Sequence, residues 1–318
     1  MNIPPYIERI EKECKERTGS LDLSNMELTE IPQEIREMTW LTNLILNTNK
    51  ISKITNLENL TQLIRIELIS NRINKIEGLQ TLIHLRFLLI ANNEIQKIEG
   101  LEEIEKLEFL YLVKNLITKI EGLSMHKSLK ALYLDENQIT KIEGLDSLLE
   151  LDTLNLSQNR ISKIENLNNN TNLVILDISK NYISKIENLT QCKNLFEIDF
   201  HENAIENIAC LQEFQQLRII GLSNTKVKDI SPLQLLQFLE TLYLSQCKLE
   251  SLEPLANKPN LKRVVLSNTD IKDLRPLLST IEKGIPVKWV YGFEDASDGI
   301  YVKDNTQLDI PKEIIEQG

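Results

Sequence analysis

The chain repeats itself every 22 residues, and this period limits the possible fold more than any other feature. Eleven consecutive copies run from Leu41 to Glu282, and each follows the pattern L-x-x-L-x-L-x-x-N-x-I-x-x-I-x-x-L-x-x-L-x-x. The first is LTNLILNTNKISKITNLENLTQ, residues 41–62, and an atypical copy of 23 residues, 18–40, precedes it. A fixed period of this size indicates an architecture in which neighbouring copies stack. Positions are numbered here from the first leucine of each copy.

The spacing of apolar residues predicts one short strand in each copy. Alternate side chains of a strand point to opposite faces, so positions four and six bury leucine while positions three, five and seven face outward. Successive strands then stack in parallel at about 4.8 Å, and isoleucine at positions eleven and fourteen fills the interior. Since no copy can bury its apolar face alone, the core exists only in the stack.

The ninth position carries asparagine in eight consecutive copies, from the copy at residues 41–62 to the copy at residues 195–216. A side-chain amide both donates and accepts hydrogen bonds, so it can satisfy backbone groups at the point where the strand turns away. We therefore predict a ladder of amides along the stack, formed by Asn49, Asn71, Asn93, Asn115, Asn137, Asn159, Asn181 and Asn203.

Together these patterns predict an α/β fold, a leucine-rich-repeat solenoid with the shape of a curved horseshoe. It has about twelve repeats, a parallel concave sheet, and short helical or 3-10 segments on its convex side. The copies resemble the 22-residue class of leucine-rich repeats that is also seen in a protein phosphatase-1 regulatory subunit and in internalins. This resemblance covers residues 18–282.

The N-terminal end of the stack needs a cap, because an open end exposes apolar residues. We expect residues 1–17 to form this cap, with an amphipathic helix that begins at prolines. The apolar face of the helix is predicted to consist of Tyr6, Ile7, Ile10 and Cys14.

Residues 283–318 leave the 22-residue pattern, and we expect them to form a C-terminal cap and a partial repeat. In this partial repeat, Ile300, Val302 and Asn305 fit positions four, six and nine. Pro311 is expected to begin a short final helix.

The repeats change character near residue 208. Upstream loops read N-x-I-x-K-I-E-G/N-L, whereas downstream loops read TKVKDISPL, CKLESLEPL and TDIKDLRPL. Asparagine at position nine becomes Thr225, Cys247 and Thr269. A hydroxyl or thiol forms fewer hydrogen bonds than an amide, so the ladder should weaken there. The change marks either a recombination seam, which we favour, or a functional bend.

Composition excludes several classes of function. The net charge is −11, from 36 Lys+Arg and 47 Asp+Glu, and this argues against nucleic-acid or anionic-membrane partners, which require a basic surface. No apolar run is long enough to span a bilayer, and the first residues lack the apolar segment of a secretory signal. Four cysteines without a paired pattern fit a reducing compartment, so we expect a cytoplasmic protein; they are Cys14, Cys192, Cys210 and Cys247.

The sequence contains no recognisable catalytic or metal site. His84, His126 and His201 lie in different copies, without the spacing to cysteines that metal sites use. Phosphate-loop, nucleophile-elbow and zinc-protease motifs are absent from the sequence. We expect His126, Cys192 and Cys210 to be packed residues, and we predict no enzyme, cofactor, metal or small-molecule substrate. An enzyme that uses His201 with Asp199 or Glu202 is the alternative.

Two charged columns accompany the repeats, with lysine at position thirteen and glutamate at position fifteen. Exposed ion pairs of this kind contribute only about 0–1 kcal/mol each. We interpret the columns as a solvated face, and a docking surface is the alternative. Their members are Lys53, Lys75, Lys97, Lys119, Lys141, Lys163 and Lys185, and Glu77, Glu99, Glu121, Glu143, Glu165 and Glu187.

The outward positions of the predicted concave sheet carry the candidate binding surface. Same-position side chains in adjacent copies lie about 4.8 Å apart, so Phe87 should neighbour Phe109, and Tyr111 should neighbour Tyr133. Exposed apolar area rimmed by charges often marks an interaction site; alternatively, concave curvature shields these residues. The predicted partner-binding residues are Ile69, Phe87, Leu89, Phe109, Tyr111, Val113, Tyr133, Asp135, Glu136, Asp177, Glu197 and Asp199, with Glu202 beside them.

Both ends of the chain resemble the repeat domain of bacterial Roco proteins. The opening, IERIEKECKERTGSLDLSNMELTEIPQEI, is similar to its first helix and repeat. The last residues, DNTQLDIPKEIIEQG, resemble the segment that joins the repeats to a Ras-like GTPase domain in that family. Thr306, Gln307 and Ile310 differ from the usual residues of this segment. The residues that match it are Asn305, Pro311, Glu313, Ile314, Gln317 and Gly318.

The Roco resemblance implies a regulatory repeat domain of a multidomain GTPase. Such a domain is a non-catalytic scaffold whose concave face binds a protein partner or another domain of the same polypeptide. The motifs of the GTPase itself do not occur in these residues. The alternative is a free-standing regulatory subunit of a phosphatase or another enzyme.

Overall fold

A computed structural model describes residues 4–292 and 297–308. The chain divides into two compact units, Met1–Arg160 and Ile161–Gly318, and each is described by itself. The predicted final helix at Pro311 and the Roco-like residues from Ile310 onward lie outside the described residues.

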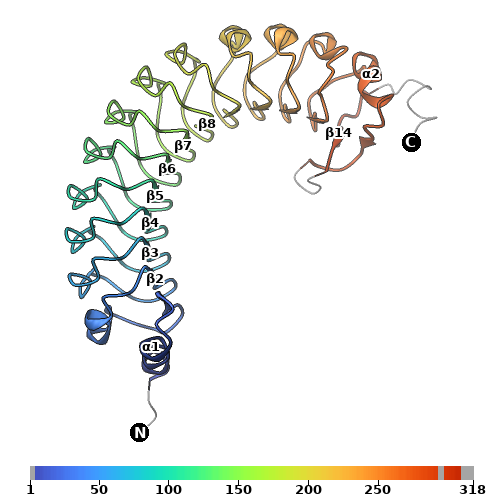
Figure 1. The fold of residues 1–318 in the computed structure, drawn as a ribbon. Coiled ribbons are helices and arrows are strands. Elements are labelled where there is room, and N and C mark those ends of the chain that lie inside the picture. The colour runs from blue at the N-terminus through green and yellow to red at the C-terminus, as the bar shows by residue number, and fades with distance from the viewer. Residues whose placement is uncertain (1–3, 293–296, 309–318) are drawn as a thin grey trace. The chain divides into compact units, whose positions relative to one another are not determined.

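The first unit is a stack of one-strand repeats with a helix at its N-terminal end (Figure 1). All of its strands pair in parallel and in chain order, with equal positions opposite one another, as Phe87 is opposite Phe109. The elements are α1 Pro5–Glu16, β1 Ser20–Asp22, η1 Gln33–Glu37, β2 Asn43–Ile45, β3 Arg65–Glu67, β4 Phe87–Leu89, β5 Phe109–Tyr111, β6 Ala131–Tyr133 and β7 Thr153–Asn155.

The second unit continues the same one-strand repeats but adds short helices to the segments that run back between strands. Its strand order is β8-β9-β10-β11-β12-β14-β13, all parallel, so β14 lies between β12 and β13. The elements are β8 Ile175–Asp177, β9 Glu197–Asp199, η2 Ala209–Glu213, β10 Ile219–Gly221, η3 Ser231–Leu235, β11 Thr241–Tyr243, η4 Glu253–Leu255, β12 Arg263–Val265, η5 Arg275–Leu277, α2 Leu278–Ile281, β13 Val287–Lys288 and β14 Gly299–Tyr301.

The leucine and isoleucine positions form the core, as predicted. In the copy over residues 63–84, all seven of these side chains are fully buried: Leu63, Ile66, Leu68, Ile73, Ile76, Leu79 and Leu82. Burial of one such side chain stabilises by roughly 1.5–3 kcal/mol. This burial requires the neighbouring copies. Each unit shows the same pattern of parallel strands over a leucine core, which confirms the solenoid prediction.

The predicted asparagine ladder is present, and each amide links two copies. Asn137 Nδ2 donates to the carbonyls of Leu112 at 2.9 Å and Leu134 at 3.0 Å. Its Oδ1 accepts from the backbone N–H of Ile117 at 3.0 Å. Three buried backbone groups from two copies therefore depend on one side chain, which fixes the register between them.

The ladder changes after Asn203 as the sequence predicts. Thr225 Oγ1 donates to the Leu222 carbonyl at 2.7 Å, and Cys247 Sγ donates to the same carbonyl at 3.0 Å. The two side chains also lie 3.5 Å apart. These shorter groups replace the three-way amide with one or two hydrogen bonds each.

The returning segments, which run back between strands, change backbone conformation at the same point. Upstream, position sixteen is left-handed and is occupied by asparagine or glycine; at Gly100, with φ of 70°, an added Cβ would lie 2.2 Å from the Ile76 carbonyl oxygen. Downstream the position holds Pro232, Pro254 and Pro276, and proline cannot adopt positive φ. Those segments form 3-10 helices instead.

The prediction of short helical segments behind the sheet is therefore confirmed only for part of the repeats. It holds in the atypical first copy, at Gln33–Glu37, and from Ala209 onward. Residues 41–208, all of which the structure describes, form turns and bends there instead. The residue at position thirteen changes in parallel: Asp229 Oδ1 accepts a hydrogen bond at 2.8 Å from the N–H of Ser231, the first residue of the 3-10 helix. The sequence change near residue 208 thus replaces a turn that has a left-handed residue with a 3-10 helix.

The N-terminal helix caps the first repeat, but its buried face differs from the prediction. Ile10 is buried as expected, whereas Cys14 is exposed. Glu13 is buried instead, because its carboxylate accepts hydrogen bonds from three donors: Thr18 Oγ1 at 2.6 Å, Gly19 N at 2.9 Å and Trp40 Nε1 at 3.1 Å. The prediction that Cys14 is buried was therefore wrong. A carboxylate that accepts hydrogen bonds from three donors can be buried in its place.

At the other end, β14 repeats the arrangement of the preceding copy. Ile300 pairs with Val264, and Ile300 and Val302 are fully buried. Asn305 Nδ2 donates to the carbonyls of Leu266 at 2.7 Å and Val302 at 3.0 Å. Its Oδ1 accepts from Thr269 N at 2.9 Å, so an amide ends the ladder at position nine.

We predict that Asn137→Ala destabilises the first unit by about 1–3 kcal/mol, because it leaves buried backbone groups without partners. Asn59→Ala is the matched control, because Asn59 is an exposed asparagine of the same unit and has no positive φ. Urea unfolding measures both. Equal unfolding midpoints for the two variants would contradict the role of the ladder.

We also predict that the Glu13 carboxylate stabilises the cap in a pH-dependent way. Burial raises the pKa of Glu13, but the donors Thr18, Gly19 and Trp40 outweigh it, so the pKa is lowered overall. The contribution of the Glu13 carboxylate to the free energy of unfolding is present above the ordinary glutamate pKa of about 4.3. It is lost as the pH falls through the lower pKa that Glu13 has in the folded chain.

Glu13→Gln should therefore lower the unfolding midpoint near neutral pH and have a smaller effect near pH 3 to 4, on the order of the ordinary carboxyl pKa values. The matched control is Glu16→Gln, an exposed glutamate of the same helix. If the effect of Glu13→Gln is the same at both pH values, or equals that of the control, the assigned role of the carboxylate is wrong.

Candidate functional site

The candidate site in the first unit lies on the sheet face, the side of the strands that points away from the core. On β4, β5 and β6 the middle residues Leu88, Leu110 and Leu132 are fully buried. The alternation of a strand therefore turns the flanking residues outward. We define the aromatic surface as Ile69, Phe87, Leu89, Phe109, Tyr111, Val113 and Tyr133, all of which are half-buried.

The four aromatic side chains form two stacked pairs. The Phe87 and Phe109 ring centroids lie 4.8 Å apart with planes 8° from parallel. The rings of Tyr111 and Tyr133 are 4.0 Å apart, at 23°. The in-register pairing of the strands creates both contacts, because it places Phe87 opposite Phe109 and Tyr111 opposite Tyr133. Each pair contributes about 0.5–1.5 kcal/mol beyond its buried area.

Charged residues beside the aromatic surface are paired with one another. Arg65 Nε lies 2.7 Å from Glu67 Oε1, and its guanidinium covers the Phe87 ring at 5.5 Å. Glu108 binds Arg86 at 2.6 Å and Lys130 at 3.3 Å. Burial raises the pKa of Glu108, but the hydrogen bonds from Arg86 and Lys130 outweigh it and lower the pKa. These pairs leave the centre of the surface without unbalanced charge.

The hydroxyl of Tyr111 stays protonated across the physiological range. Its burial, the neighbouring Tyr133 hydroxyl and the charge of Asp135 all raise its pKa. A protonated phenol can donate a hydrogen bond to a partner. Asp135 is half-buried and Glu136 is exposed just after the end of β6, so they lie at the margin of the surface.

The remaining predicted residues lie in the second unit, on β8 and β9. Asp177 and Asp199 are register partners, and Glu197 shares the sheet face with them. His201 Nδ1 lies 2.8 Å from Asp199 Oδ1, and Nε2 lies 3.9 Å from Glu202 Oε1. The structure therefore groups these residues, while the aromatic surface belongs to the other unit.

Sequence reasoning missed the arginines that border the aromatic surface. Arg65 and Arg86 both approach the Phe87 ring, at 5.5 and 5.9 Å. The signal was available, since Arg65 is at position three beside Phe87 and Arg86 precedes Phe87 in the chain. Their ion-pair partners depend on side-chain conformation, which the repeat pattern does not specify.

His126 and Cys192 are packed residues, as the sequence indicates, whereas Cys210 is half-buried. His126 is fully buried, its Nε2 lies 3.1 Å from the Leu101 carbonyl oxygen, and burial lowers its pKa. Cys192 is buried, and this burial raises its pKa to about 11, so the thiol is unreactive. Within the described residues, no group of three or more His, Cys, Asp or Glu side chains is arranged to hold a metal.

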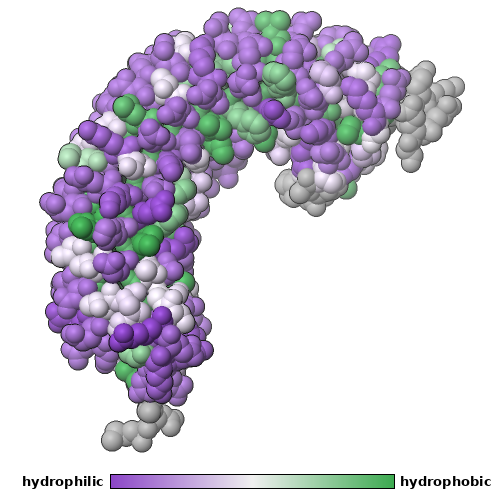
Figure 2. All heavy atoms as spheres, viewed as in Figure 1, coloured by the Kyte–Doolittle hydropathy of each residue, from purple (hydrophilic) through white to green (hydrophobic). Residues whose placement is uncertain are grey.

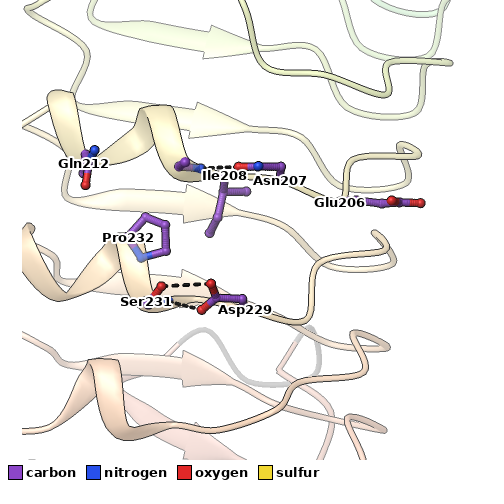
Figure 3. Close-up of a pocket in the computed structure, with 8 residues that line it drawn as sticks. Glu206, Asn207, Ile208, Gln212, Asp229, Ser231 and Pro232 are labelled. Atoms are coloured by element: carbon purple, nitrogen blue, oxygen red, sulfur yellow. Dashed lines mark hydrogen bonds between the residues drawn. The ribbon is translucent and has the colours of Figure 1, made fainter.

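A polar hollow of about 400 Å³ lies between two adjacent returning segments, lined in part by Gln212 and Pro232. Figure 3 shows that two of its polar side chains, Asn207 and Asp229, form hydrogen bonds with nearby residues. Asn207 Oδ1 accepts from the N–H of Ala209 at 2.7 Å, and Asp229 accepts from both N and Oγ of Ser231. Both side chains bind the first residue of a 3-10 helix, so the hollow follows from the local turn geometry.

Hydrophobic residues elsewhere on the surface are scattered. Figure 2 shows small apolar groups among hydrophilic residues on the face in view. In the part of the chain that the structure describes, no helix is long and apolar enough to cross a membrane. The large exposed apolar side chains are Ile83, Leu116, Met125, Leu149, Tyr182, Leu235, Phe238, Trp289 and Val290.

Comparisons with known proteins agree with this architecture. A family model described as leucine-rich repeats (2 copies) matches residues 105–147, 150–191 and 237–279. The crystal structure of an internalin, inlF of Listeria monocytogenes, is 27% identical with a TM-score of 0.72, covering 86% of this chain and 91% of that chain. No curated protein matches the sequence.

Two further solved structures share the fold. A leucine-rich-repeat protein of Leptospira interrogans is 25% identical with a TM-score of 0.69, covering 78% of this chain and 72% of that chain. The leucine-rich-repeat domain of APL1B is 20% identical with a TM-score of 0.68, over 88% and 92% of the two chains. The repeats, the strand stacks and these matches define the class: the chain is a leucine-rich-repeat protein.

We predict that the aromatic surface can be truncated without loss of the fold. Tyr111→Ala should cost about 1 kcal/mol, the value of one aromatic pair. Leu110→Ala, its inward neighbour on the same strand, should cost about 2–5 kcal/mol, because it leaves a cavity in the core. Urea unfolding compares them. A loss for Tyr111→Ala as large as that for Leu110→Ala would show that the ring belongs to the core.

Proposed function

We propose that this protein is a non-catalytic protein-interaction scaffold and that the aromatic surface is its main docking site. The stacked pairs Phe87–Phe109 and Tyr111–Tyr133 carry the proposal. Their strand positions face solvent, and the adjacent leucines complete the core without them. Rigid aromatic residues most often dominate the energy of protein interfaces. Stacking also fixes the rings before binding, which reduces the entropy lost on association.

The charge pattern favours an uncharged, apolar segment of the partner at this site. Arg65, Arg86 and Lys130 already bind Glu67 and Glu108, so a charged partner group would have to break one of these pairs. An apolar segment would instead cover the ring edges, with the Tyr111 hydroxyl available as a donor. The carboxylates Asp135 and Glu136 at the margin would select for a basic or polar group nearby.

The carboxylates of the second unit would form a second contact. Asp177, Glu197 and Asp199 lie on one sheet face and favour a basic or polar group of the partner. They would act mainly on the association rate and its salt dependence, whereas the aromatic rings would set the lifetime of the complex.

We further propose that this chain is the regulatory repeat domain of a cytoplasmic, Roco-type multidomain GTPase. The opening residues support this context, since α1 leads into β1 over the segment that resembles the start of Roco repeats. The partner would then be another protein or another domain of the same polypeptide. A free-standing regulatory subunit of a phosphatase or another enzyme is the alternative. The gene sequence after codon 318 distinguishes them: GTPase motifs support the first, and a stop codon supports the second.

The test of the docking site is a binding titration with the partner, taken either from the source cells or as the rest of the polypeptide supplied in trans. Phe109→Ala/Tyr111→Ala should weaken binding by roughly 30-fold or more, equivalent to about 2 kcal/mol for a central anchor. The matched control is Lys97→Ala/Lys119→Ala, which removes two exposed lysines from the returning segments.

The control should bind as well as the unmodified chain. If the aromatic variant binds normally while the lysine variant is impaired, the docking site lies on the returning segments, and the proposal is wrong. Circular dichroism of both variants verifies that each remains folded.

A further inference from the structure

Strands β8 and β9 bring three carboxylates together on the sheet face of the second unit. Asp177 and Asp199 are direct partners across the parallel pair. Glu197 lies two residues before Asp199 on the same strand, so its side chain points to the same side. All three are half-buried. Like charges in this arrangement destabilise a sheet unless a cation or a proton compensates them.

Two other carboxylates beside the strands, Glu67 and Glu240, have close cationic partners. Glu67 Oε1 lies 2.7 Å from Arg65 Nε in the first unit. In the second unit, Glu240 binds Arg218 at 2.7 Å and Lys262 at 2.8 Å. In contrast, within the described residues no lysine or arginine forms an ion pair with Asp177, Glu197 or Asp199.

The cation available to this carboxylate group is a histidine. His201 Nδ1 lies 2.8 Å from Asp199 Oδ1, and the backbone N–H of His201 donates to the same oxygen at 2.9 Å. On its other side, His201 Nε2 lies 3.9 Å from Glu202 Oε1. Lys180 Nζ is also 3.9 Å from Glu202 Oε1, so the lysine charge is directed to Glu202.

The neighbouring strand adds no compensating charge. Gly221 of β10 pairs with Asp199 and carries no side chain; a Cβ there would lie 2.2 Å from Asp199 Oδ1, so the carboxylate occupies that space. Arg218, the basic residue before β10, is bound to Glu240 and covers the Phe196 ring at 5.3 Å. The charge of the group therefore depends on protons.

The direction of each pKa agrees with this geometry. Burial and the charge of Asp199 raise the pKa of Asp177 against the hydrogen bond from Ser179. Burial, Asp199 and Asp177 raise the pKa of Glu197. Burial lowers the pKa of His201, but its hydrogen bond to Asp199 and the charges of Asp199, Asp177 and Glu202 outweigh it and raise the pKa.

We propose that the sheet face of β8 and β9 is a pH-dependent switch. At low pH, protons on His201 and on the carboxylates offset the negative charge of this surface. As the pH rises these protons leave, and the surface becomes strongly anionic. This inference concerns the second unit alone and stands whether or not the aromatic surface binds a partner.

The linkage has a defined sign. His201, Asp177 and Glu197 hold protons more tightly in the folded chain than in the unfolded chain. Their contribution to stability is therefore fully present below the ordinary pKa values and is lost as the pH rises through the folded values. The same rise in pH increases the attraction of this face for cationic groups of a partner.

The test is an NMR titration of the histidine ring protons in the intact chain, with His201→Gln used to assign the His201 signal. We expect His201 to titrate above the ordinary histidine value of about 6.5. Asp199→Asn and Asp177→Asn should each lower the titration midpoint. Glu240→Gln is the matched control, because it removes a carboxylate beside the strands of the same unit that already has two cationic partners.

A His201 midpoint at or below 6.5 in the unmodified chain, on the order of the free side chain, would overturn the proposal. A shift in Glu240→Gln as large as that in Asp199→Asn would also overturn it. Because the unmodified chain supplies the first comparison, the test does not depend on the folding of any variant. An unchanged His201 midpoint in Asp177→Asn would contradict the assigned coupling between Asp177 and His201.

Discussion

The hydrogen bonds of one side chain per copy set the register on which the whole structure depends. Asn137 holds carbonyls at 2.9 and 3.0 Å and an N–H at 3.0 Å, and these three backbone groups come from two copies. The leucine core alone would tolerate small shifts between copies, because dispersion and burial have no direction. The hydrogen bonds of the asparagine amide are directional, so they hold each copy in a register that places equal positions of adjacent copies opposite each other. The stacked rings of Phe87 and Phe109, and of Tyr111 and Tyr133, are consequences of that register.

The same register separates the residues that stabilise the fold from those that are free to bind. Inward positions such as Leu88 and Leu110 are fully buried and have no access to a partner. Outward positions can vary in charge and shape with little cost to the core, and the two units use this freedom differently. The first unit places aromatic rings among paired charges. The second places Asp177 and Asp199 side by side with a histidine as the compensating group.

Much of the fold could be predicted because the repeat makes every position visible many times. Ile66 and Leu68 are buried where the period places them, and the weaker contacts of Thr225 follow from its short side chain. Single events were harder to predict. Glu13 is buried instead of Cys14 because donors from residues as distant as Trp40 converge on it, and no local pattern records that convergence. The Arg65–Glu67 pair depends in the same way on side-chain conformation.

Hydroxyl-radical footprinting of the protein with and without its partner tests the central claim most directly, since aromatic side chains report their own solvent exposure. Tyr182 is 67% exposed on a returning segment and serves as the internal reference. If the register built by the amide ladder presents the docking site, binding should protect Phe109, Tyr111 and Tyr133 while Tyr182 reacts as before. Protection of Tyr182 with unchanged reactivity of Tyr111 and Tyr133 would contradict the account, because the partner would then bind the returning segments.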